Sequence, residues 1–411
     1  MKKVPVYDAD ALVEEYGSPL FVASAEAITA NLEALRREFS SRYPRLAVSY
    51  SYKVGSIPGI LEVVHRDGTW AEVASGFEYE LARRLGVPGT SIVFNGPYKT
   101  REELERALDE GALVNVDNRD ELETLKHIAA ARGGGIAAGI RVSTDVGINQ
   151  LPDRFGFNFE SGEAEKAALE CAAAGIRVAG LHIHLTSYII RPGGEEGSPA
   201  RDIELIWPKN PDAYRRAAEN LARLAKDLES RHGIKIEYID MGGGFPSVGA
   251  LGPYVDAVTA PLLAGFEDSE PPLLILEPGR AVVGDAVDLI ATVVSSKDLS
   301  GGGRAVVIDA GVNLLPTSFW RHQTVELPGN PEGEPKETIV YGPLCLQTDI
   351  VTRAALPPLA PGDRIVIRNV GAYNIPQSGT FIFPRPPIIL LDNGAARVVR
   401  ERETVESAFF K

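Results

Sequence analysis

The stretch VSYSYKVG, residues 48–55, sets the question of the fold. Larger side chains alternate with serines up to Lys53, which is typical of a β-strand. A glycine follows the strand, and a helical pattern over 56–66 comes next. A strand that delivers a lysine to a turn before a helix is one β/α unit. The lysine is either a solvated side chain or a nucleophile at the mouth of a barrel.

The same order recurs along the chain, with amphipathic helical patterns such as 99–111 and 118–132 between strand-like segments. The segments predicted as strands are 46–52, 69–74, 91–95, 112–116, 136–142, 177–184, 234–240 and 272–277. Repeated β/α units of this number are typical of a (β/α)8 TIM barrel. A doubly wound open sheet is the alternative that periodicity alone leaves open.

The pattern changes after about residue 285, where strands and turn residues follow one another with few helical segments. We therefore predict a barrel over 24–285 and a C-terminal all-β domain over 286–411, joined by the N-terminal residues 1–23. The segment 188–211 is rich in glycine, proline and charge. Such a segment after a strand indicates a long loop, which we expect at the barrel mouth.

Composition restricts the class of function. The 411 residues carry a formal net charge of −14, which argues against nucleic acid because there is no basic surplus to neutralise phosphates. The two cysteines, Cys171 and Cys345, make no disulfide framework. Neither a signal peptide nor a membrane span is indicated, and we predict no metal site. These features favour a cytoplasmic protein that handles small molecules.

Residues with useful chemistry fall where the predicted strands end, which is where barrel enzymes place their active sites. These positions are Lys53, Glu72, Asn95, Arg141, His184, 242–244 and 277–280. The triple glycine in IDMGGGF, 239–245, is either a tight turn or a phosphate cradle. Arg280 in LEPGR suits a phosphate, and Glu277 suits a positive group. A lysine, a phosphate cradle and a carboxylate together fit pyridoxal 5′-phosphate.

The chain resembles the fold-type III decarboxylases of the diaminopimelate and ornithine decarboxylase family, which share an alanine racemase-like barrel and a β domain. The matching motifs, in family order, are YSYKV (50–54), EVASGFEYELA (72–82), IVFNGPYKTREEL (92–104), DRFGF (153–157), GLHIHLTS (180–187), IDMGGGF (239–245), EPGR (277–280), GPLC (342–345) with Asp349, and GAY (371–373). The resemblance implies a pyridoxal phosphate-dependent carboxy-lyase that acts on an amino acid.

The resemblance also implies roles for single residues. Lys53 carries the Schiff base, His184 stacks on the cofactor ring, and Glu277 pairs with the pyridine nitrogen. Glu72 and Arg141 form an ion pair under the lysine. The residues implied for the phosphate are Ser187, Gly242, Gly243, Gly244, Arg280 and Tyr373. Either His182 or His184 is a packed core histidine.

By the same resemblance, Cys345 and Asp349 enter the active site from a second subunit, so the active form is a homodimer. The sequence departs from the family at Leu346, where diaminopimelate decarboxylases have a glutamate for the distal ammonium group. Pro316 and Thr317 stand near the place of an arginine for the distal carboxylate, and Arg321 follows a few residues on.

These departures predict a substrate other than meso-diaminopimelate, since an unpaired charge is costly in a closed pocket. The residues expected to contact that substrate are Asp349, Leu346, Gln347, Phe319, Trp320 and Arg321. Three alternatives stay open: a diaminopimelate decarboxylase of lysine biosynthesis, an amino-acid racemase on the same fold, and a non-catalytic protein that binds pyridoxal phosphate. Glu277 and Cys345 argue against a racemase.

Overall fold

The computed structural model of the chain describes residues 7–147, 154–185, 189–190, 203–204, 210–329 and 331–410. The chain divides into two compact units. The barrel unit comprises 32–53 and 64–281, and the β unit comprises 1–31, 54–63 and 282–411. The domain boundary between 285 and 286 stays a prediction. Most of the expected loop at 188–211 lies outside the described residues.

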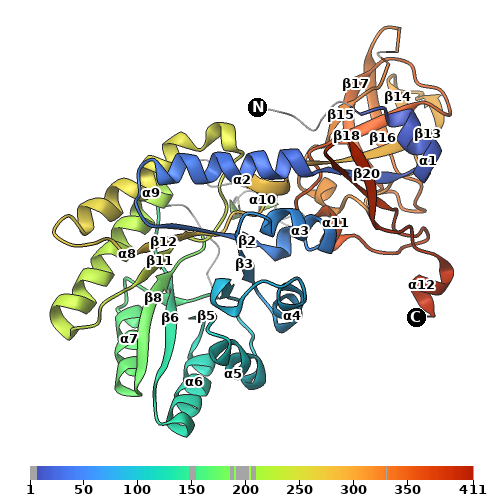
Figure 1. Cartoon of the computed structure of the whole chain (residues 1–411). Helices are drawn as coiled ribbons and strands as arrows, with labels where there is room; N and C mark the ends of the chain where they lie inside the picture. Colours follow the sequence, from blue (N-terminus) through green and yellow to red (C-terminus); the bar gives the residue numbers. More distant parts are fainter. Residues whose placement is uncertain are drawn as a thin grey trace, which may run out of the picture. The chain divides into compact units, whose positions relative to one another are not determined.

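The barrel unit contains a closed sheet of eight parallel strands in the described part of the chain (Figure 1). Its strands are β2 (Leu46–Ser51), β3 (Trp70–Val73), β4 (Ile92–Phe94), β5 (Leu113–Val116), β6 (Ile136–Ser143), β8 (Ile176–His182), β11 (Tyr238–Asp240) and β12 (Leu273–Leu276). The spatial order is β5-β4-β3-β2-β12-β11-β8-β6, and pairing of β5 with β6 closes the ring. The predicted (β/α)8 barrel is confirmed, and the open sheet is excluded.

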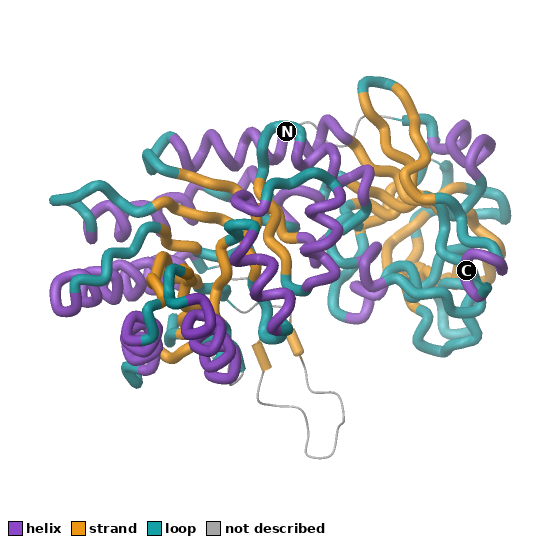
Figure 2. The backbone as a smooth tube through the Cα atoms, turned by 60° about the horizontal axis from the view of Figure 1, so that its bottom comes forward, coloured by secondary structure: helices purple, strands orange, loops and turns teal. Residues whose placement is uncertain are grey.

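Helices connect these strands, and the alternation of strand and helix is visible in Figure 2. They are α2 (Ala25–Ser40), α3 (Pro58–His65), α4 (Gly76–Arg84), α5 (Arg101–Asp109), α6 (Arg119–Arg132), α7 (Glu163–Ala173), α8 (Pro211–His232), α9 (Gly252–Gly265) and α10 (Arg280–Val283). Local signals set their ends. Thr100 begins α5 with a capping box, Asn118 caps α6, and Gly133 ends α6 in the left-handed region.

The β unit is built on a mixed sheet in the order β17-β16-β14-β13-β1-β19-β20, with β18 and β15 beside it. Its strands are β1 (Leu20–Ser24), β13 (Val287–Asp298), β14 (Arg304–Ile308), β15 (Thr324–Glu326), β16 (Lys336–Tyr341), β17 (Ile350–Leu356), β18 (Arg364–Arg368), β19 (Ile388–Asp392) and β20 (Ala395–Arg400). The N-terminal strand β1 pairs with β13 and β19. Apolar side chains such as Leu20, Ile290 and Ile389 form a core on this sheet.

Several short elements complete the described chain. They are α1 (Ala9–Tyr16), η1 (Tyr52–Val54), η2 (Gly89–Ser91), β7 (Phe157–Asn158), β9 (Ile189–Ile190), β10 (Ile203–Glu204), η3 (Val248–Ala250), η4 (Pro316–Phe319), α11 (Asn374–Gln377) and α12 (Val405–Phe409). Among the residues that the structure describes, no helix combines the length and apolar composition that a membrane crossing requires.

Candidate active site

Lys53 lies in the short turn η1, directly after the first barrel strand, β2. Its Nζ donates to Oε2 of Glu72 over 2.7 Å. The lysine side chain is 38% exposed, whereas that of Glu72 is 1% exposed. Ser51 donates its hydroxyl to the same carboxylate oxygen. A partly exposed amine is therefore held in place by a buried carboxylate at the C-terminal end of the barrel.

Glu277 directly follows strand β12 and is buried. Its Oε2 lies 3.6 Å from Nε2 of His182 and 3.8 Å from Nδ1 of His184. Burial alone would raise the pKa of Glu277, but the two histidines and Lys53 outweigh it, and the pKa lies well below the usual value. Glu277 is therefore a buried carboxylate held in its ionised form.

The two histidines differ in their surroundings. His182 ends β8 and is buried, and burial lowers its pKa although Glu277 opposes the effect. Neither of its ring nitrogens has a hydrogen-bond partner among the described residues. The side chain of His184 is 27% exposed, and its Nδ1 accepts from the backbone N–H of Gly243 over 3.2 Å. His182 is thus the core histidine, and His184 is the one that faces outward.

Asp240 ends strand β11 and is completely buried. Burial raises its pKa well above the usual value, and the nearby charge of Glu277 adds to the effect. Its Oδ1 accepts from the backbone N–H of Gly242 over 2.9 Å. We therefore assign Asp240 as protonated beside an ionised Glu277, because two adjacent buried carboxylates do not both carry charge.

The glycine turn 242–244 has a shape that requires glycine. Gly242 and Gly244 have positive φ angles of 63° and 87°. A Cβ on Gly243 would lie 2.3 Å from the backbone oxygen of Glu277, and one on Gly242 would lie 2.4 Å from that of Ile183. Neighbouring backbone thus excludes side chains from Gly242 and Gly243, and the turn presents bare backbone beside Glu277 and His184.

The residues present fit pyridoxal phosphate. A lysine amine, a buried ionised carboxylate and a side-chain-free glycine turn all lie at the C-terminal ends of neighbouring strands. Strand β12 lies between β2 and β11 and pairs with both. Arg280 begins α10, three residues after Glu277. These groups match an aldehyde, a protonated ring nitrogen and a phosphate. Ser187, which is also expected at the phosphate, lies outside the described residues.

The expected ion pair between Glu72 and Arg141 is wrong. Arg141 donates to Oδ1 of Asp117 over 2.7 Å, and its guanidinium lies 4.3 Å from the centre of the Phe155 ring. Glu72 pairs with Lys53 instead. Asp117 directly follows strand β5, which pairs with the strand that carries Arg141. The pairing of β5 with β6 therefore makes Asp117 the partner of Arg141. The sequence around Arg141 does not reveal this pairing.

The β unit carries the remaining candidates. Cys345 is exposed, as are Leu346 and Gln347. Asp349 is 1% exposed, and its carboxylate accepts from the backbone N–H groups of Val312 over 2.8 Å and Leu344 over 2.7 Å. Both of its oxygens are thus engaged inside the β unit. Asp349 is placed to hold the loop that presents Cys345, and this differs from the direct substrate contact that we expected.

Two further groups of candidates lie in the β unit. Tyr373 has a left-handed backbone with a φ of 66°, and its N–H donates to the carbonyl of Val54 over 2.9 Å. Phe319, Trp320 and Arg321 line a cavity of about 230 Å³ together with His322 and Arg353. Burial lowers the pKa of Arg321.

Sequence reasoning missed several polar residues of the barrel interior. Asp117 and Asp240 had no assigned role, His182 was considered only as a packed core histidine, and Asn115 and Tyr238 went unnoticed. Asp117, Asp240 and His182 stand at strand ends, so strand-end position was an available signal for them. Asn115 and Tyr238 lie inside strands, where a polar residue was interpreted as part of the strand pattern.

Comparison with known proteins gives consistent matches. The family model described as "Pyridoxal-dependent decarboxylase, pyridoxal binding domain" matches residues 28–192 and 208–284. Diaminopimelate decarboxylase of Methanothermobacter thermautotrophicus is 30% identical over 97% of this chain and 92% of its own length. That of Aquifex aeolicus is 29% identical over 96% and 91%. The crystal structure of the M. jannaschii enzyme with L-lysine superposes with a TM-score of 0.85 and 26% identity, covering 98% and 94%.

These comparisons contradict the expectation of a substrate other than diaminopimelate. Relatives that match almost the full length of the chain carry the name diaminopimelate decarboxylase. The expectation rested on single positions, chiefly Leu346 and the Pro316–Thr317 pair. It assumed that a recognition charge must stay at a fixed place in the sequence, although side chains from other positions can supply the same charge in space.

Proposed function

Because the chain belongs to the pyridoxal-dependent decarboxylase family, we propose that it decarboxylates diaminopimelate to lysine. Likeness to diaminopimelate decarboxylases over nearly the whole of both chains is the observation that carries this proposal. In the reaction, the bond from one α-carbon to its carboxylate breaks and CO2 leaves. The electron pair stays on the α-carbon, which then takes up a proton. Pyridoxal phosphate, when bound, supplies the electron sink for that pair.

Lys53 is proposed as the amine that binds the cofactor covalently. Its ion pair with Glu72 supports this role, because the buried carboxylate fixes the direction of a flexible side chain. The exposed fraction of 38% leaves the amine accessible.

Glu277 is proposed to keep the cofactor ring nitrogen protonated. Its low pKa supports this role, since an ionised carboxylate stabilises a neighbouring positive charge. His184 is proposed to cover the ring face. Gly242, Gly243, Gly244 and Arg280, with Ser187 and Tyr373, are proposed to hold the phosphate.

The active form is proposed to be a cytoplasmic homodimer in which Cys345 of one subunit serves the cofactor of the other. The exposure of Cys345, with a buried Asp349 fixing its loop, supports this arrangement. Cys345 is proposed to lie near the α-carbon that receives the proton. Leu346, Gln347, Phe319, Trp320 and Arg321 are proposed to line the substrate pocket, with Arg321 as the candidate partner of a substrate carboxylate.

A substrate panel tests the proposal. The protein saturated with pyridoxal phosphate is given meso-diaminopimelate, lysine, ornithine or arginine, and both CO2 and the amine product are measured. We expect kcat/KM for meso-diaminopimelate to exceed that for each other amino acid by about 100-fold or more, because a paired distal charge discriminates strongly. Lys53→Ala is the inactive control. A higher kcat/KM for another amino acid would contradict the proposal.

A further inference from the structure

A line of three polar side chains crosses the interior of the barrel below the candidate active site. The Tyr238 hydroxyl, on β11, donates to Oδ1 of Asn115 over 2.7 Å. Nδ2 of Asn115, on β5, donates to Oδ1 of Asn95 over 2.9 Å. Nδ2 of Asn95 then donates to Oε1 of Glu277 over 2.5 Å and to Oε1 of Glu72 over 3.2 Å. Two residues in strands and one directly after strand β4 thus form one continuous chain of hydrogen bonds.

The ionised carboxylate of Glu277 fixes the direction of this chain. An ionised carboxylate only accepts hydrogen bonds, so Asn95 must turn its NH2 group toward Glu277 and Glu72. The carbonyl oxygen of Asn95 then faces Asn115, which must present its own NH2 group. The remaining oxygen of Asn115 requires a donor, which is the Tyr238 hydroxyl. Every member of the chain is paired when the Glu277 oxygen that faces Asn95 carries no proton.

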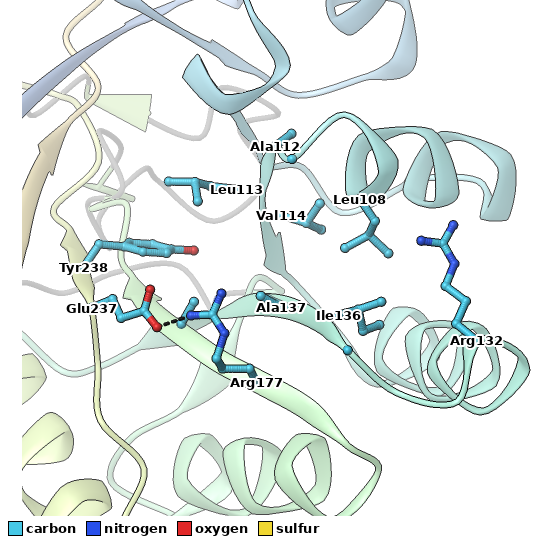
Figure 3. A pocket seen from close by; sticks show the side chains of 14 residues that line it. Leu108, Ala112, Leu113, Val114, Arg132, Ile136, Ala137, Arg177, Glu237 and Tyr238 are labelled. Carbon is cyan, nitrogen blue, oxygen red and sulfur yellow. Dashed lines mark hydrogen bonds and ion pairs between the residues drawn. The ribbon is translucent and has the colours of Figure 1, made fainter.

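The far end of the chain is a permanent donor. Burial raises the pKa of Tyr238, and the nearby carboxylates of Glu237 and Glu277 add to the effect, so the phenol stays protonated. Its ring helps to line a cavity of about 270 Å³ that also contains Arg177 and Glu237 (Figure 3). The cavity lies at the starts of β5, β6, β8 and β11, whereas Glu277 follows the end of β12. The chain therefore joins opposite ends of the barrel.

Two glycines inside neighbouring strands make room for these side chains. A Cβ on Gly139, in β6, would lie 2.2 Å from both Oδ1 of Asn115 and the Tyr238 hydroxyl. A Cβ on Gly180, in β8, would lie 2.2 Å from the Tyr238 ring. Glycine weakens a strand interior and marks close approach of another group. The sequence thus has two residues that are unfavourable in strands at the places where Asn115 and Tyr238 need space.

We propose that Asn95, Asn115 and Tyr238 form a positioning relay that holds Glu277 ionised and correctly oriented for the cofactor ring. The inference rests on the proposed role of Glu277 and goes beyond it, because the relay residues touch neither cofactor nor substrate in this scheme. Asn95 is the key member, since its single NH2 group bridges the carboxylate beside the lysine and the carboxylate beside the ring. Loss of the relay therefore makes Glu277 easier to protonate.

Binding of pyridoxal phosphate to the apoprotein, measured from pH 4 to pH 8 by fluorescence quenching, tests the relay without relying on turnover. In the wild type, His182, His184 and Lys53 hold the pKa of Glu277 well below its usual value, so the fall in affinity that accompanies protonation of Glu277 lies at the acid end of this range or below it. We expect Asn95→Leu, which keeps the size but removes the donor, to move that fall upward by about 1–2 pH units. Tyr238→Phe should shift it in the same direction by less. The pH at which kcat falls in acid should move in the same direction. We call the fall of affinity or kcat at low pH the acid limb.

Tyr43→Phe is the matched control, because Tyr43 is also buried in the barrel unit and donates its hydroxyl to the carbonyl of Pro272 over 2.9 Å. We expect it to leave the acid limb of binding unchanged. Glu277→Gln separates the two possible failures. An acid limb that persists in Glu277→Gln would overturn the role of Glu277 itself.

The acid limb of pyridoxal phosphate binding could disappear in Glu277→Gln and yet stay at its wild-type pH in both Asn95→Leu and Tyr238→Phe. That result would overturn the relay alone. If Asn95→Leu does not fold, Tyr238→Phe decides the matter. It removes one oxygen atom at the end of the relay and leaves the carboxylates untouched. Equal shifts in Tyr238→Phe and Tyr43→Phe would show a general effect of hydroxyl loss and would also overturn the relay.

Discussion

Replacing Asp349 tests whether this residue anchors the Cys345 loop or contacts substrate. Its carboxylate is bound by the backbone N–H groups of Val312 and Leu344, and two glycines close around it. A Cβ on Gly342 would lie 2.3 Å from Oδ2 of Asp349, and one on Gly311 would lie 2.9 Å from Oδ1. The site is shaped around this carboxylate, so Asp349→Ala should release the loop.

The expected loss follows from the groups left behind. Asp349→Ala leaves two buried N–H groups without their acceptors, at about 1–3 kcal/mol each. Burial raises the pKa of Asp349, which means that the buried carboxylate itself carries a cost that the substitution removes. We therefore expect a net loss of about 3 kcal/mol, in the lower half of the range. A loss of that size lowers the melting temperature of the β unit by about 6–12 °C.

Thermal unfolding, the rate of Cys345 alkylation and kcat should be measured together on Asp349→Ala. We expect lower stability, faster alkylation and lower kcat, because the loop residue Leu344 loses its anchor next to the thiol. Asp363→Asn is a suitable control, since Asp363 accepts one backbone N–H, that of Ala360, at an exposed turn of the β unit. Unchanged stability with a large rise in KM would instead indicate that Asp349 contacts substrate, and the anchoring argument would be refuted.

Two other predictions concern assembly and acid stability. Mixing inactive Lys53→Ala and Cys345→Ala subunits should restore part of the activity, because one hybrid site is intact; no recovery after proven subunit exchange would place each site within one chain. Burial opposes ionisation of Glu403, but bonds from Arg385 and Thr380 outweigh it and lower its pKa to about 2. Stability from Glu403 is thus present above its unfolded pKa of about 4.3 and is lost as pH falls toward 2. Glu403→Gln should cost about 1–3 kcal/mol at pH 7, and denaturant unfolding should show that the difference shrinks in acid.

The barrel could be predicted from sequence because its strands are short, apolar and separated by capped helices. All eight predicted barrel strands are present, although β11 begins at Tyr238 and not at residue 234. In the β unit, β15 and β17 were not predicted. Strand β17 alternates buried and exposed residues only in part, and β15 is three residues long, so neither carries a clear periodic signal.

The site was predictable where chemistry sits at strand ends and unpredictable where partners are chosen by strand neighbours. Lys53, Glu72 and Glu277 became candidates because each stands at or near the end of a predicted strand, and the structure brings Lys53 and Glu72 into contact, while their roles stay proposals. The partner of Arg141 was missed because Asp117 becomes adjacent only when β5 pairs with β6 and closes the barrel. The substrate prediction failed for a related reason, since a charge missing at Leu346 says nothing about charges that the fold brings in from elsewhere.

The glycines of β6 and β8 carried information that the strand pattern concealed. Gly139 and Gly180 are poor strand formers, and neither needs a positive φ, so backbone conformation does not explain them. The explanation is space, because each lies where a Cβ would collide with Tyr238. A glycine inside a buried barrel strand therefore points to a large polar side chain arriving from another strand. Here that side chain is Tyr238, and it begins the proposed hydrogen-bond relay that ends on Glu277. The two strand glycines thus lead to the carboxylate on which catalysis is proposed to depend.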